Sequence, residues 1–513
     1  MGIVIYPPTI DWGYMKQRPQ HVMSMFASHG IPVLYFNKRN QEGPVIEKAA
    51  PNLYVIHHFE FFMQALYGQL QGERLLWSSW SKMLGHASRF RPNRTVYDCV
   101  DDFPDWEADE KKWAHVADLI VCTAEHLQEK MRALVPDKPN VLIRNGCDWN
   151  HFAAKPSGRS PALSALPPTA GYRIGYVGAW APWVDEQLVR KTAAAFPDSQ
   201  LVIVGPKLRS DADDLGPNVF NLGYMDYQEL PLLLAGLDVC LIPFRLNRIT
   251  ESTNPIKVYE YLAAGKPVVS TGLPEVRKLA PTVSVADDHE SFIEAVRLAL
   301  TTTPEERERL SQYARSFSWE QRFDQIHMAL HAHCPEFFTP VLDASAVSAL
   351  DRLCGTYAST SKSLRHGTVN SYYRKMALPQ DPPMIGTLTG GEYQCCFQLD
   401  SSASLPDFEK AYLEFEVNAS EQSSREAVIE IGVGYTPWSR STLTYENKPP
   451  MTTFTRFRPA DFVSETISIE VTSYFRQNHR PSFQLRTDHN QLIGIGQARM
   501  TFITKETHNE WRG

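Results

Sequence analysis

The stretch Glu251-Ser-Thr-Asn-Pro-Ile-Lys-Val-Tyr-Glu-Tyr-Leu-Ala-Ala-Gly-Lys-Pro-Val-Val-Ser270 joins a polar loop, a helical segment and a short apolar strand. Gly265 suits the end of the helix, and the strand follows at once, as in open α/β sheets. Asn254 is a good N-cap and Pro255 suits the first helical position. We therefore expect unpaired amides near residues 254–257, where the helix dipole favours a phosphate.

Two charged residues on this helix extend the same interpretation. Lys257 adds a positive charge close to the expected phosphate. Glu260 carries a carboxylate that accepts hydrogen bonds from two adjacent hydroxyls, such as those of a ribose. A diphosphate site beside a diol acceptor predicts a nucleotide-diphosphate ligand. Taken alone, the segment fits an ordinary capped helix with an exposed glutamate equally well.

The first 330 residues alternate apolar strand runs with helical patterns, which predicts doubly wound, mostly parallel sheets. We expect strands at Ile3–Tyr6, Pro32–Phe36, Leu53–His57, Thr95–Cys99, Leu119–Cys122 and Val141–Ile143, and helices beginning near Arg18, Met63 and Glu125. Residues 154–171, rich in Pro, Ser, Ala and Gly, indicate a linker. Beyond it we expect strands at Leu201–Gly205, Val219–Leu222, Val239–Pro243, Pro267–Ser270 and Thr282–Val285. Two such lobes predict a cleft beside the carboxyl ends of the strands.

Beyond Pro335 the helical periodicity fades, and Thr, Ser and β-branched residues become frequent. Runs of alternating polarity lie at Ala411–Val417, Ala427–Val433, Thr466–Thr472 and Ser482–Arg486. Turn-forming residues separate these runs. The pattern predicts an antiparallel β-sandwich over residues 365–505.

Composition excludes several classes of protein. A length of 513 residues suggests about three or four domains. Lys and Arg total 51 against 58 Asp and Glu, and a net charge of −7 argues against non-specific nucleic-acid binding. The eight cysteines form no CxxC pair, so neither a disulfide framework nor a zinc site is expected. The start of the chain does not resemble a signal peptide, and no apolar run approaches ~18 residues. We therefore expect a cytoplasmic protein.

Six motifs follow one another in the first 280 residues. They are Asp11-Trp-Gly-Tyr-Met-Lys-Gln-Arg-Pro-Gln-His21, Ala117-Asp-Leu-Ile-Val-Cys-Thr-Ala-Glu-His-Leu127, Ile143-Arg-Asn-Gly-Cys-Asp-Trp-Asn-His-Phe152, Ile174-Gly-Tyr-Val-Gly178, Leu201-Val-Ile-Val-Gly205 and the segment from Asn254 to Val276. In order and spacing they resemble retaining, GT-B-fold glycosyltransferases that use nucleotide sugars, of the group 1, family 4-like, teichuronic-acid type. The resemblance covers about residues 1–330.

The resemblance implies a fold of α/β class, with two Rossmann-like domains (GT-B) followed by an all-β jelly-roll sandwich. It implies an acceptor domain at residues 1–155, a donor domain at residues 170–320, and a helix at residues 320–333 that crosses back to the first domain. Pieces of residues 365–505 resemble jelly-roll modules related to disaggregatase repeats (DNRLRE), some of which bind carbohydrate. A docking or oligomerisation role for this module stays open.

The donor site implied by the resemblance departs from the family pattern in two places. Glu260 corresponds to the glutamate that binds the nucleotide ribose, but its partner eight positions earlier is replaced by Ser252, with Glu251 one residue before it. Relatives also carry Arg and Lys after Gly178, where this chain has Ala-Trp-Ala; Arg245 and Arg248 are further candidates for the phosphates. The predicted donor-binding residues are Gly178, Lys207, Arg209, Glu251, Ser252, Thr253, Asn254, Lys257 and Glu260.

The acceptor side is expected in the first half of the chain. Asp11, Trp12 and Arg18 follow the first strand and are predicted to bind the acceptor; Trp12 offers a ring for stacking on a sugar. The predicted catalytic residues are His21, Asp101 and Asp102. The two aspartates follow a strand at its carboxyl end, where one of them would bind the acceptor hydroxyl or act as its base.

These residues predict a glycosyltransferase that moves a sugar from a nucleotide sugar to a glycan or lipid-linked acceptor in cell-surface polysaccharide synthesis. Two alternatives stay open: a nucleotide-sugar epimerase, and a non-catalytic carbohydrate-binding scaffold. We expect no cofactor and no essential metal ion, because relatives of this fold mostly work without one. Peripheral attachment to the inner face of the membrane and the oligomeric state are left open.

Overall fold

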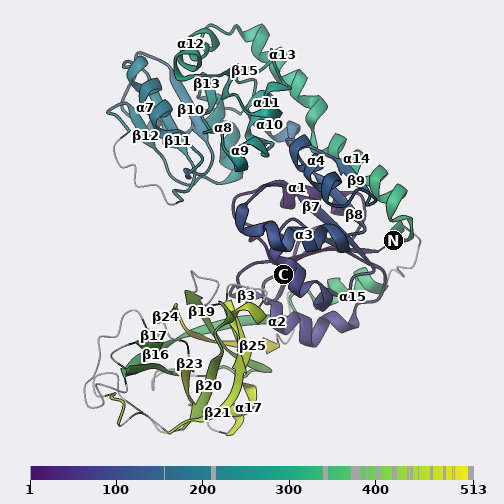
Figure 1. Cartoon of the computed structure of the whole chain (residues 1–513), viewed down its shortest axis with the longest axis vertical. Helices are drawn as coiled ribbons and strands as arrows, with labels where there is room; N and C mark the ends of the chain where they lie inside the picture. Colours follow the sequence, from purple (N-terminus) through teal and green to yellow (C-terminus); the bar gives the residue numbers. More distant parts are fainter. Residues whose placement is uncertain are drawn as a thin grey trace, which may run out of the picture. The chain divides into compact units, whose positions relative to one another are not determined.

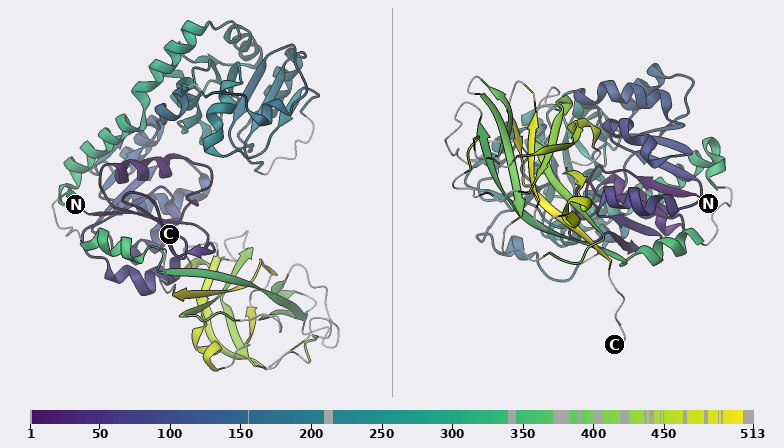
Figure 2. Two further views of the ribbon diagram at one scale, coloured as in Figure 1. Left: turned by 180° about the vertical axis from the view of Figure 1, so that it is seen from behind. Right: turned by 90° about the horizontal axis from the view of Figure 1, so that it is seen from below.

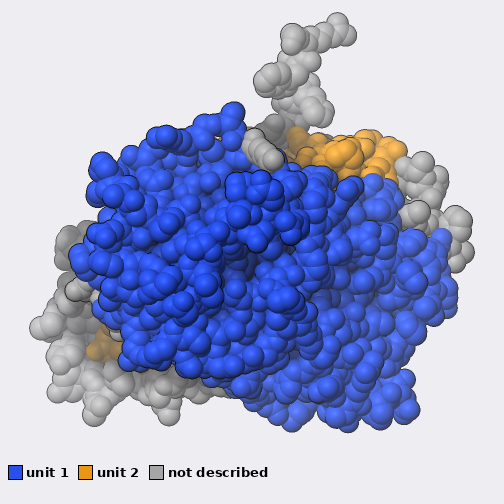
Figure 3. Space-filling view, turned by 90° about the horizontal axis from the view of Figure 1, so that it is seen from above, with its two compact units in different colours: residues 1–6, 13–33, 73–341 blue, residues 7–12, 34–72, 342–513 orange. Residues whose placement is uncertain are grey.

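The computed structural model describes residues 2–154, 156–208, 215–338, 345–370, 383–388, 391–399, 405–418, 425–435, 438, 443–446, 448, 450–462, 466–477, 481–487, 489 and 492–505. Two compact units divide the chain (Figure 3). Unit 1 comprises residues 1–6, 13–33 and 73–341, and unit 2 comprises residues 7–12, 34–72 and 342–513. The N-terminal part of the chain therefore contributes to both units.

The first lobe of unit 1 is a parallel sheet with the strand order β1-β6-β7-β8-β9. Figure 1 labels β7, β8 and β9 of this sheet. Its strands are β1 (Ile3–Tyr6), β6 (Arg74–Ser78), β7 (Arg94–Cys99), β8 (Leu119–Cys122) and β9 (Asn140–Leu142). Its helices are α1 (Arg18–Ser28), η3 (Ser81–Phe90), η4 (Pro104–Trp106), α3 (Glu107–Val116), α4 (Glu125–Leu134) and α5 (Trp149–Ala153). The strands that were predicted in this lobe are confirmed. Strand β6 is an additional strand that the sequence analysis did not predict.

The second lobe of unit 1 is a parallel sheet with the order β12-β11-β10-β13-β14-β15. Its strands are β10 (Arg173–Val177), β11 (Gln200–Val204), β12 (Val219–Asn221), β13 (Val239–Ile242), β14 (Val268–Thr271) and β15 (Ser284–Ala286). Its helices are α6 (Pro161–Ser164), α7 (Glu186–Ala195), η5 (Tyr227–Glu229), α8 (Leu230–Ala235), α9 (Arg248–Glu251), α10 (Ile256–Ala263), α11 (Pro274–Arg277) and α12 (His289–Ala299). The strand order reverses direction at β10, which makes this a doubly wound sheet.

Both faces of this second sheet are buried, which explains its nearly continuous apolar strands. Alternate residues of β11 lie in two separate cores. Leu201 and Ile203 belong to one cluster, and Val202 and Val204 belong to the other. Side chains that alternate across a strand thus build a core on each side of the sheet.

Two consecutive helices follow the second lobe, with a break between them. Helix α13 (Pro304–Ala314) leads through the turn η6 (Arg315–Phe317) into α14 (Trp319–His333), visible in Figures 1 and 2. The Trp319 ring stacks on His21 of α1 at 5.0 Å, and Phe323 meets Phe26 edge-on at 5.0 Å. Helix α14 therefore returns the chain onto α1 of the first lobe.

Unit 2 contains a long antiparallel sheet with the order β21-β20-β23-β18-β17-β24-β19-β25-β16-β3, and β22 pairs with β19. Its strands are β3 (Gly43–Pro44), β16 (Tyr357–Asn370), β17 (Met384–Leu388), β18 (Gly391–Leu399), β19 (Lys410–Asn418), β20 (Ile429–Gly434), β21 (Thr452–Phe457), β22 (Thr466–Glu470), β23 (Ser482–Thr487), β24 (Ile493–Ile495) and β25 (Arg499–Lys505). The four predicted β runs are confirmed as β19, β20, β22 and β23.

Other elements of unit 2 come from its N-terminal segments and from the connections of the sheet. They are β2 (Val33–Phe36, of which Val33 belongs to unit 1), β4 (Ile46–Ala50), β5 (Leu53–Ile56), α2 (Phe59–Phe61), η1 (Phe62–Leu66), η2 (Tyr67–Gln69), α15 (Ser345–Leu353), η8 (Pro459–Asp461) and α17 (Thr472–Gln477). The C-terminal β-sandwich region therefore folds together with residues 34–72.

A buried carboxylate joins these two parts of unit 2. Glu414 of β19 is fully buried, and its Oε1 accepts from Asn40 Nδ2 at 2.6 Å and lies 3.0 Å from His58 Nε2. Its Oε2 accepts from Arg499 Nε at 2.9 Å and Thr501 Oγ1 at 2.7 Å. Burial opposes ionisation, yet the neighbouring His58 and Arg499 and the Thr501 hydroxyl together lower the pKa of Glu414 to about 2.

Replacing Glu414 by glutamine is expected to destabilise unit 2 by about 3 kcal/mol, because it leaves the buried His58 and the half-buried Arg499 beside an uncharged partner. The pKa of Glu414 lies below its ordinary value of 4.5, so its contribution to stability is present above about pH 4.5 and lost as the pH falls toward 2. Differential scanning calorimetry of the full chain at pH 7 and pH 4 measures both effects. Glu416→Gln, at an exposed position two residues along the same strand, is the matched control. Equal melting temperatures for the two variants would contradict the prediction.

Candidate functional site

The loop before α10 joins the two lobes of unit 1. The predicted N-cap at Asn254 is wrong by one residue, since Pro255 occupies the cap and no side chain bonds there. Asn254 is used instead as a bridge: its Oδ1 accepts from Asn145 N at 2.9 Å and its Nδ2 donates to Tyr259 Oη at 3.0 Å. Asn145 Nδ2 returns a bond to the Asn254 carbonyl at 2.6 Å. The start of α10 therefore lies at the junction of the lobes.

Glu260 is a buried carboxylate, and one of its oxygens has no hydrogen-bond partner among the described residues. Its side chain is 1% exposed, so the alternative of an exposed glutamate is wrong. Oε2 lies 2.6 Å from Lys257 Nζ, whereas Oε1 has no hydrogen-bond partner in the described part of the chain. Burial raises the pKa of Glu260, and Lys257 opposes that rise. Buried acceptors are nearly always paired, so the free oxygen indicates a position where a ligand donates.

His21 lies close to the same cluster of charges. Its ring stacks on Trp319 and meets Tyr227 edge-on at 5.5 Å, and its Nε2 has no hydrogen-bond partner among the described residues. Burial, reinforced by Lys16 and Lys257, holds the pKa of His21 well below its ordinary value. The imidazole is therefore neutral at pH 7 and can offer one hydrogen bond to a ligand.

Asp101 and Asp102 follow β7 and have opposite environments. Asp102 is bound twice by Arg248, at 2.8 Å for each pair of atoms, and by Lys130 at 2.7 Å. Burial opposes ionisation, but these cations lower the pKa of Asp102. Asp101 accepts one hydrogen bond, from Thr253 Oγ1 at 3.3 Å, and burial raises its pKa to about 7. Adjacent carboxylates with separated pKa values suit different roles, and Asp101 is the one suited to proton transfer near neutral pH.

The hydroxyls of the predicted donor loop are partly used within the loop itself. Ser252 is buried and donates to the carbonyls of Arg248 at 3.1 Å and Ile249 at 2.8 Å. Thr253 donates to the Ile249 carbonyl at 2.7 Å as well as to Asp101. Donor binding by Ser252 and Thr253 stays a prediction.

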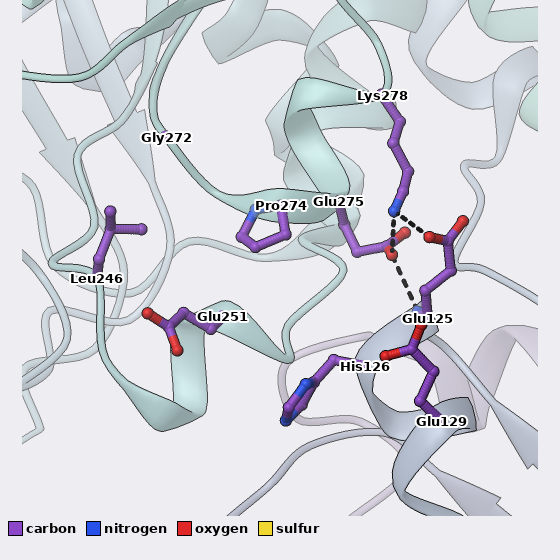
Figure 4. A pocket seen from close by; sticks show the side chains of 9 residues that line it. All are labelled: Glu125, His126, Glu129, Leu246, Glu251, Gly272, Pro274, Glu275 and Lys278. Atoms are coloured by element: carbon purple, nitrogen blue, oxygen red, sulfur yellow. Dashed lines mark hydrogen bonds and ion pairs between the residues drawn. The ribbon is translucent and has the colours of Figure 1, made fainter. Parts of the chain in front are cut away.

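Glu251, the other predicted residue of this loop, lines a pocket of about 300 Å³ between the two lobes (Figure 4). Residues of both lobes surround this pocket: Glu125, His126, Glu129, Leu246, Glu251, Gly272, Pro274, Glu275 and Lys278. Lys278 lies 2.6 Å from Glu125 and 3.3 Å from Glu275, which draws the two lobes together. Glu251 is exposed and reaches the pocket from α9 (Figure 4).

The remaining predicted donor residues lie at the carboxyl ends of β10 and β11. Gly178 donates to the Val204 carbonyl at 2.8 Å, and a side chain on the neighbouring Gly205 would collide with the Gly178 carbonyl. Lys207 is exposed just beyond β11, and Arg209 lies outside the described residues. Phosphate binding by Lys207 and Arg209 stays a prediction. Arg248, weighed as a further candidate, is already engaged by Asp102.

Two of the predicted acceptor residues belong to unit 2 and make structural bonds there. Asp11 accepts from the backbone and side-chain nitrogens of Arg39, each at 3.0 Å. Trp12 donates its backbone N–H to Asn37 Oδ1 at 2.8 Å and is half-buried. Arg18 belongs to unit 1 and is buried, with its Nε bound to both oxygens of Asp98 at 2.9 and 3.1 Å. Acceptor binding by these three residues stays a prediction.

The described residues show neither a cluster of metal ligands nor a membrane-spanning helix. They contain no group of three or more His, Cys, Asp or Glu side chains arranged to hold a metal ion. They contain no helix long and apolar enough to span a bilayer. That the protein needs no metal ion stays a prediction.

The second lobe matches a known protein family by sequence. Residues 172–302 match the family model described as glycosyl transferases group 1. TuaH of Bacillus subtilis, named as a teichuronic acid biosynthesis glycosyltransferase, is 30% identical over 223 residues. The match covers 41% of this chain and 56% of that relative, so the chain spans just over half of the relative's length. The chain therefore carries a group 1 glycosyltransferase domain.

Solved structures share the fold of the two lobes. A sucrose-phosphate synthase from Thermosynechococcus elongatus superposes with a TM-score of 0.55 at 16% identity, covering 65% of this chain and 99% of that one. Anabaena HepE, crystallised in complex with UDP and glucose, superposes with a TM-score of 0.51 at 14% identity, covering 64% and 99%. These likenesses confirm the predicted GT-B-like pair of Rossmann-type domains.

Replacing Asn254 by alanine is expected to lower the free energy of unfolding of unit 1 by about 2 kcal/mol, because it leaves the half-buried Asn145 N–H and the buried Tyr259 hydroxyl without partners. The melting temperature of the full chain measures the change. Asn150→Ala, at an exposed position of α5, should leave it unaltered. A variant at position 254 as stable as the wild type would show that the bridge between the lobes carries no net stability.

Proposed function

Given the group 1 glycosyltransferase domain at residues 172–302, we propose that the chain transfers a sugar from a nucleotide-diphosphate donor to a glycan or lipid-linked acceptor, with retention at the anomeric carbon. The similarity to TuaH supports an acceptor that belongs to cell-surface polysaccharide synthesis. The fold shared with HepE, which was crystallised with UDP and glucose, supports a nucleotide sugar as the donor.

The observation that carries this proposal is the free Oε1 of Glu260. A carboxylate buried to this degree with one unsatisfied oxygen is costly unless a donor group completes it. Two neighbouring hydroxyls of a ribose are such donors, and Lys257 keeps the second oxygen charged and in place. Glu260 therefore serves as the acceptor for the nucleoside end of the donor.

Transfer requires stabilisation of the departing diphosphate, which is the largest expected electrostatic contribution to catalysis. The start of α10 supplies backbone amides for the diphosphate, while the charge of Lys257 is shared with Glu260. Asp101 lies beside this loop through its bond to Thr253, so it is placed to take the proton of the incoming acceptor hydroxyl. In this reading Asp102 positions Arg248 and takes no proton.

Replacing Glu260 by alanine is expected to abolish nucleotide-sugar binding and transfer without unfolding the chain. The removed carboxylate supplies charge-assisted hydrogen bonds to the ligand, each worth about 1.5–3 kcal/mol. A thermal-shift screen with UDP, GDP and TDP sugars and CMP sugars, followed by a transfer assay with the best donor, measures both losses. Glu305→Ala, an exposed glutamate on α13, is the control for charge removal.

Three results would lead to different conclusions. Full turnover by the Glu260 variant would refute the donor-site assignment. Interconversion of the nucleotide sugar without an acceptor would favour an epimerase. If no nucleotide sugar shifts the melting of the wild type, a non-catalytic carbohydrate-binding scaffold becomes the better description.

Replacing Asp101 by asparagine is expected to lower the transfer rate by about 10²–10⁴-fold and to flatten its pH profile. Burial raises the pKa of Asp101 to about 7, so the wild type should lose rate as the pH falls below about 7, where the base becomes protonated. The rate measured from pH 5 to pH 9 with saturating donor tests this. The Asp102→Asn variant should still lose rate as the pH falls below about 7, whatever its maximal rate, because the pKa of Asp102 lies below its ordinary value. If the Asp101→Asn variant still loses rate below about pH 7, Asp101 is not the base.

A further inference from the structure

Three unpaired polar atoms lie around one cluster of side chains in unit 1. Glu260 Oε1, His21 Nε2 and Tyr227 Oη are each buried, and none has a hydrogen-bond partner in the described part of the chain. His21 and Tyr227 are in edge contact, and the Glu260 charge acts on Tyr227. The side chains come from both lobes, since His21 lies on α1 and Tyr227 begins η5. Several orphaned atoms at one place indicate a ligand more strongly than one alone.

Lys16 completes this cluster from the loop between β1 and α1. Its ammonium lies 4.6 Å from the centre of the Tyr227 ring. Burial lowers the pKa of Lys16, while Asp148 and Glu260 oppose that change by their charge. Lys16 nevertheless forms no ion pair with either carboxylate within the described residues. It is therefore a half-buried cation whose charge the protein leaves uncompensated, apart from the face of one aromatic ring.

The loop that carries Lys16 is fastened to the second lobe. Tyr14 stacks on Tyr224 at 5.5 Å, and the Met15 N–H donates to Tyr224 Oη at 3.3 Å. Met15 has a φ of 44°, a left-handed backbone conformation that residues other than glycine rarely adopt. Such strain persists only where surrounding contacts impose it, and it collects at ligand sites. These contacts fix the position of Lys16 across from Glu260.

The charge balance of the cluster favours an anionic ligand. Lys257 is neutralised by Glu260 at 2.6 Å, so it offers little net charge. Arg248 is neutralised by Asp102, and the residues that follow Gly178 carry no cation. Lys16 is a cation near this site that no carboxylate of the described residues pairs directly. A diphosphate placed beside a ribose on Glu260 would give it a partner.

We propose that Lys16 and Tyr227 bind the diphosphate of the donor, with the Lys16 ammonium replacing the cations that relatives carry after the glycine of β10. This inference rests on the proposed function and adds two residues to it. The Tyr227 hydroxyl donates to a phosphate oxygen, and the neutral His21 donates or accepts one further bond to the same ligand. The β1–α1 loop thereby closes over the diphosphate from the first lobe, while α10 holds the nucleoside from the second.

The test compares Lys16→Met, Lys16→Arg and Tyr227→Phe with the wild type by isothermal titration calorimetry on the full chain. UDP, GDP, TDP and pyrophosphate are the charged probes, and uridine, guanosine and thymidine are their uncharged counterparts. Lys16→Met should weaken binding of the preferred diphosphate by about tenfold or more and leave binding of its nucleoside unchanged. Lys16→Arg should recover part of the loss, and Tyr227→Phe should weaken diphosphate binding by about threefold to tenfold.

Lys112→Met, which removes an exposed lysine of α3, is the matched control and should bind as the wild type does. Circular dichroism and the melting temperature establish that each variant is folded. If the wild type binds a diphosphate and Lys16→Met binds it equally well, the inference is overturned while the proposed function stands. If Lys16→Met weakens binding of the nucleoside as much as binding of the diphosphate, Lys16 does not act through the diphosphate and the inference is again overturned. If the wild type binds none of the probes, the proposed function itself fails.

Discussion

The burial of Glu260 is the constraint on which the rest of the site depends. A carboxylate in a nearly dry environment needs either a proton or full pairing, and the protein supplies pairing for only one of its oxygens, through Lys257. The rest of α10 cannot relieve this cost, because Val258 and Leu262 are packed in the core of the second lobe. The apolar side chains of α10 therefore hold the helix in place. A ligand that donates to Glu260 Oε1 would complete the pairing of its carboxylate.

Local patterns in the sequence were sufficient to predict the sheets of unit 1. Apolar runs marked the strands because both faces of a parallel sheet are buried. Strand β6 (Arg74–Ser78) was not predicted, because its apolar run consists only of Leu75, Leu76 and Trp77. The start of α10 was misplaced because Asn254, a good local cap, is engaged by Asn145 from the other lobe. Contacts between residues so distant in the chain leave no trace in propensities or spacing.

The β-sandwich region shows the same limit more sharply. In the alternating run from Ala411 to Val417, Glu414 looks like an ordinary polar residue on the solvent face of a strand. It is in fact fully buried, because Asn40 and His58 cover that face with a segment of the N-terminal half. Alternation predicts which side chains share a face, but it cannot tell whether another part of the chain covers that face. An appended module was predicted, and a region that folds together with residues 34–72 was found.

The missing cations after Gly178 follow from packing. Gly178 and Gly205 bring β10 and β11 so close that a side chain at Gly205 would collide with the Gly178 carbonyl. The residues that follow Gly178 are then drawn into the lobe, where Trp180 is buried and its backbone N–H bonds to the Pro206 carbonyl at 2.9 Å. A long cationic side chain at position 180 would have to replace a core tryptophan. A diphosphate bound here must find its charge elsewhere, and a loop crossing from the first lobe with Lys16 is the route that leaves the packing of the second lobe intact.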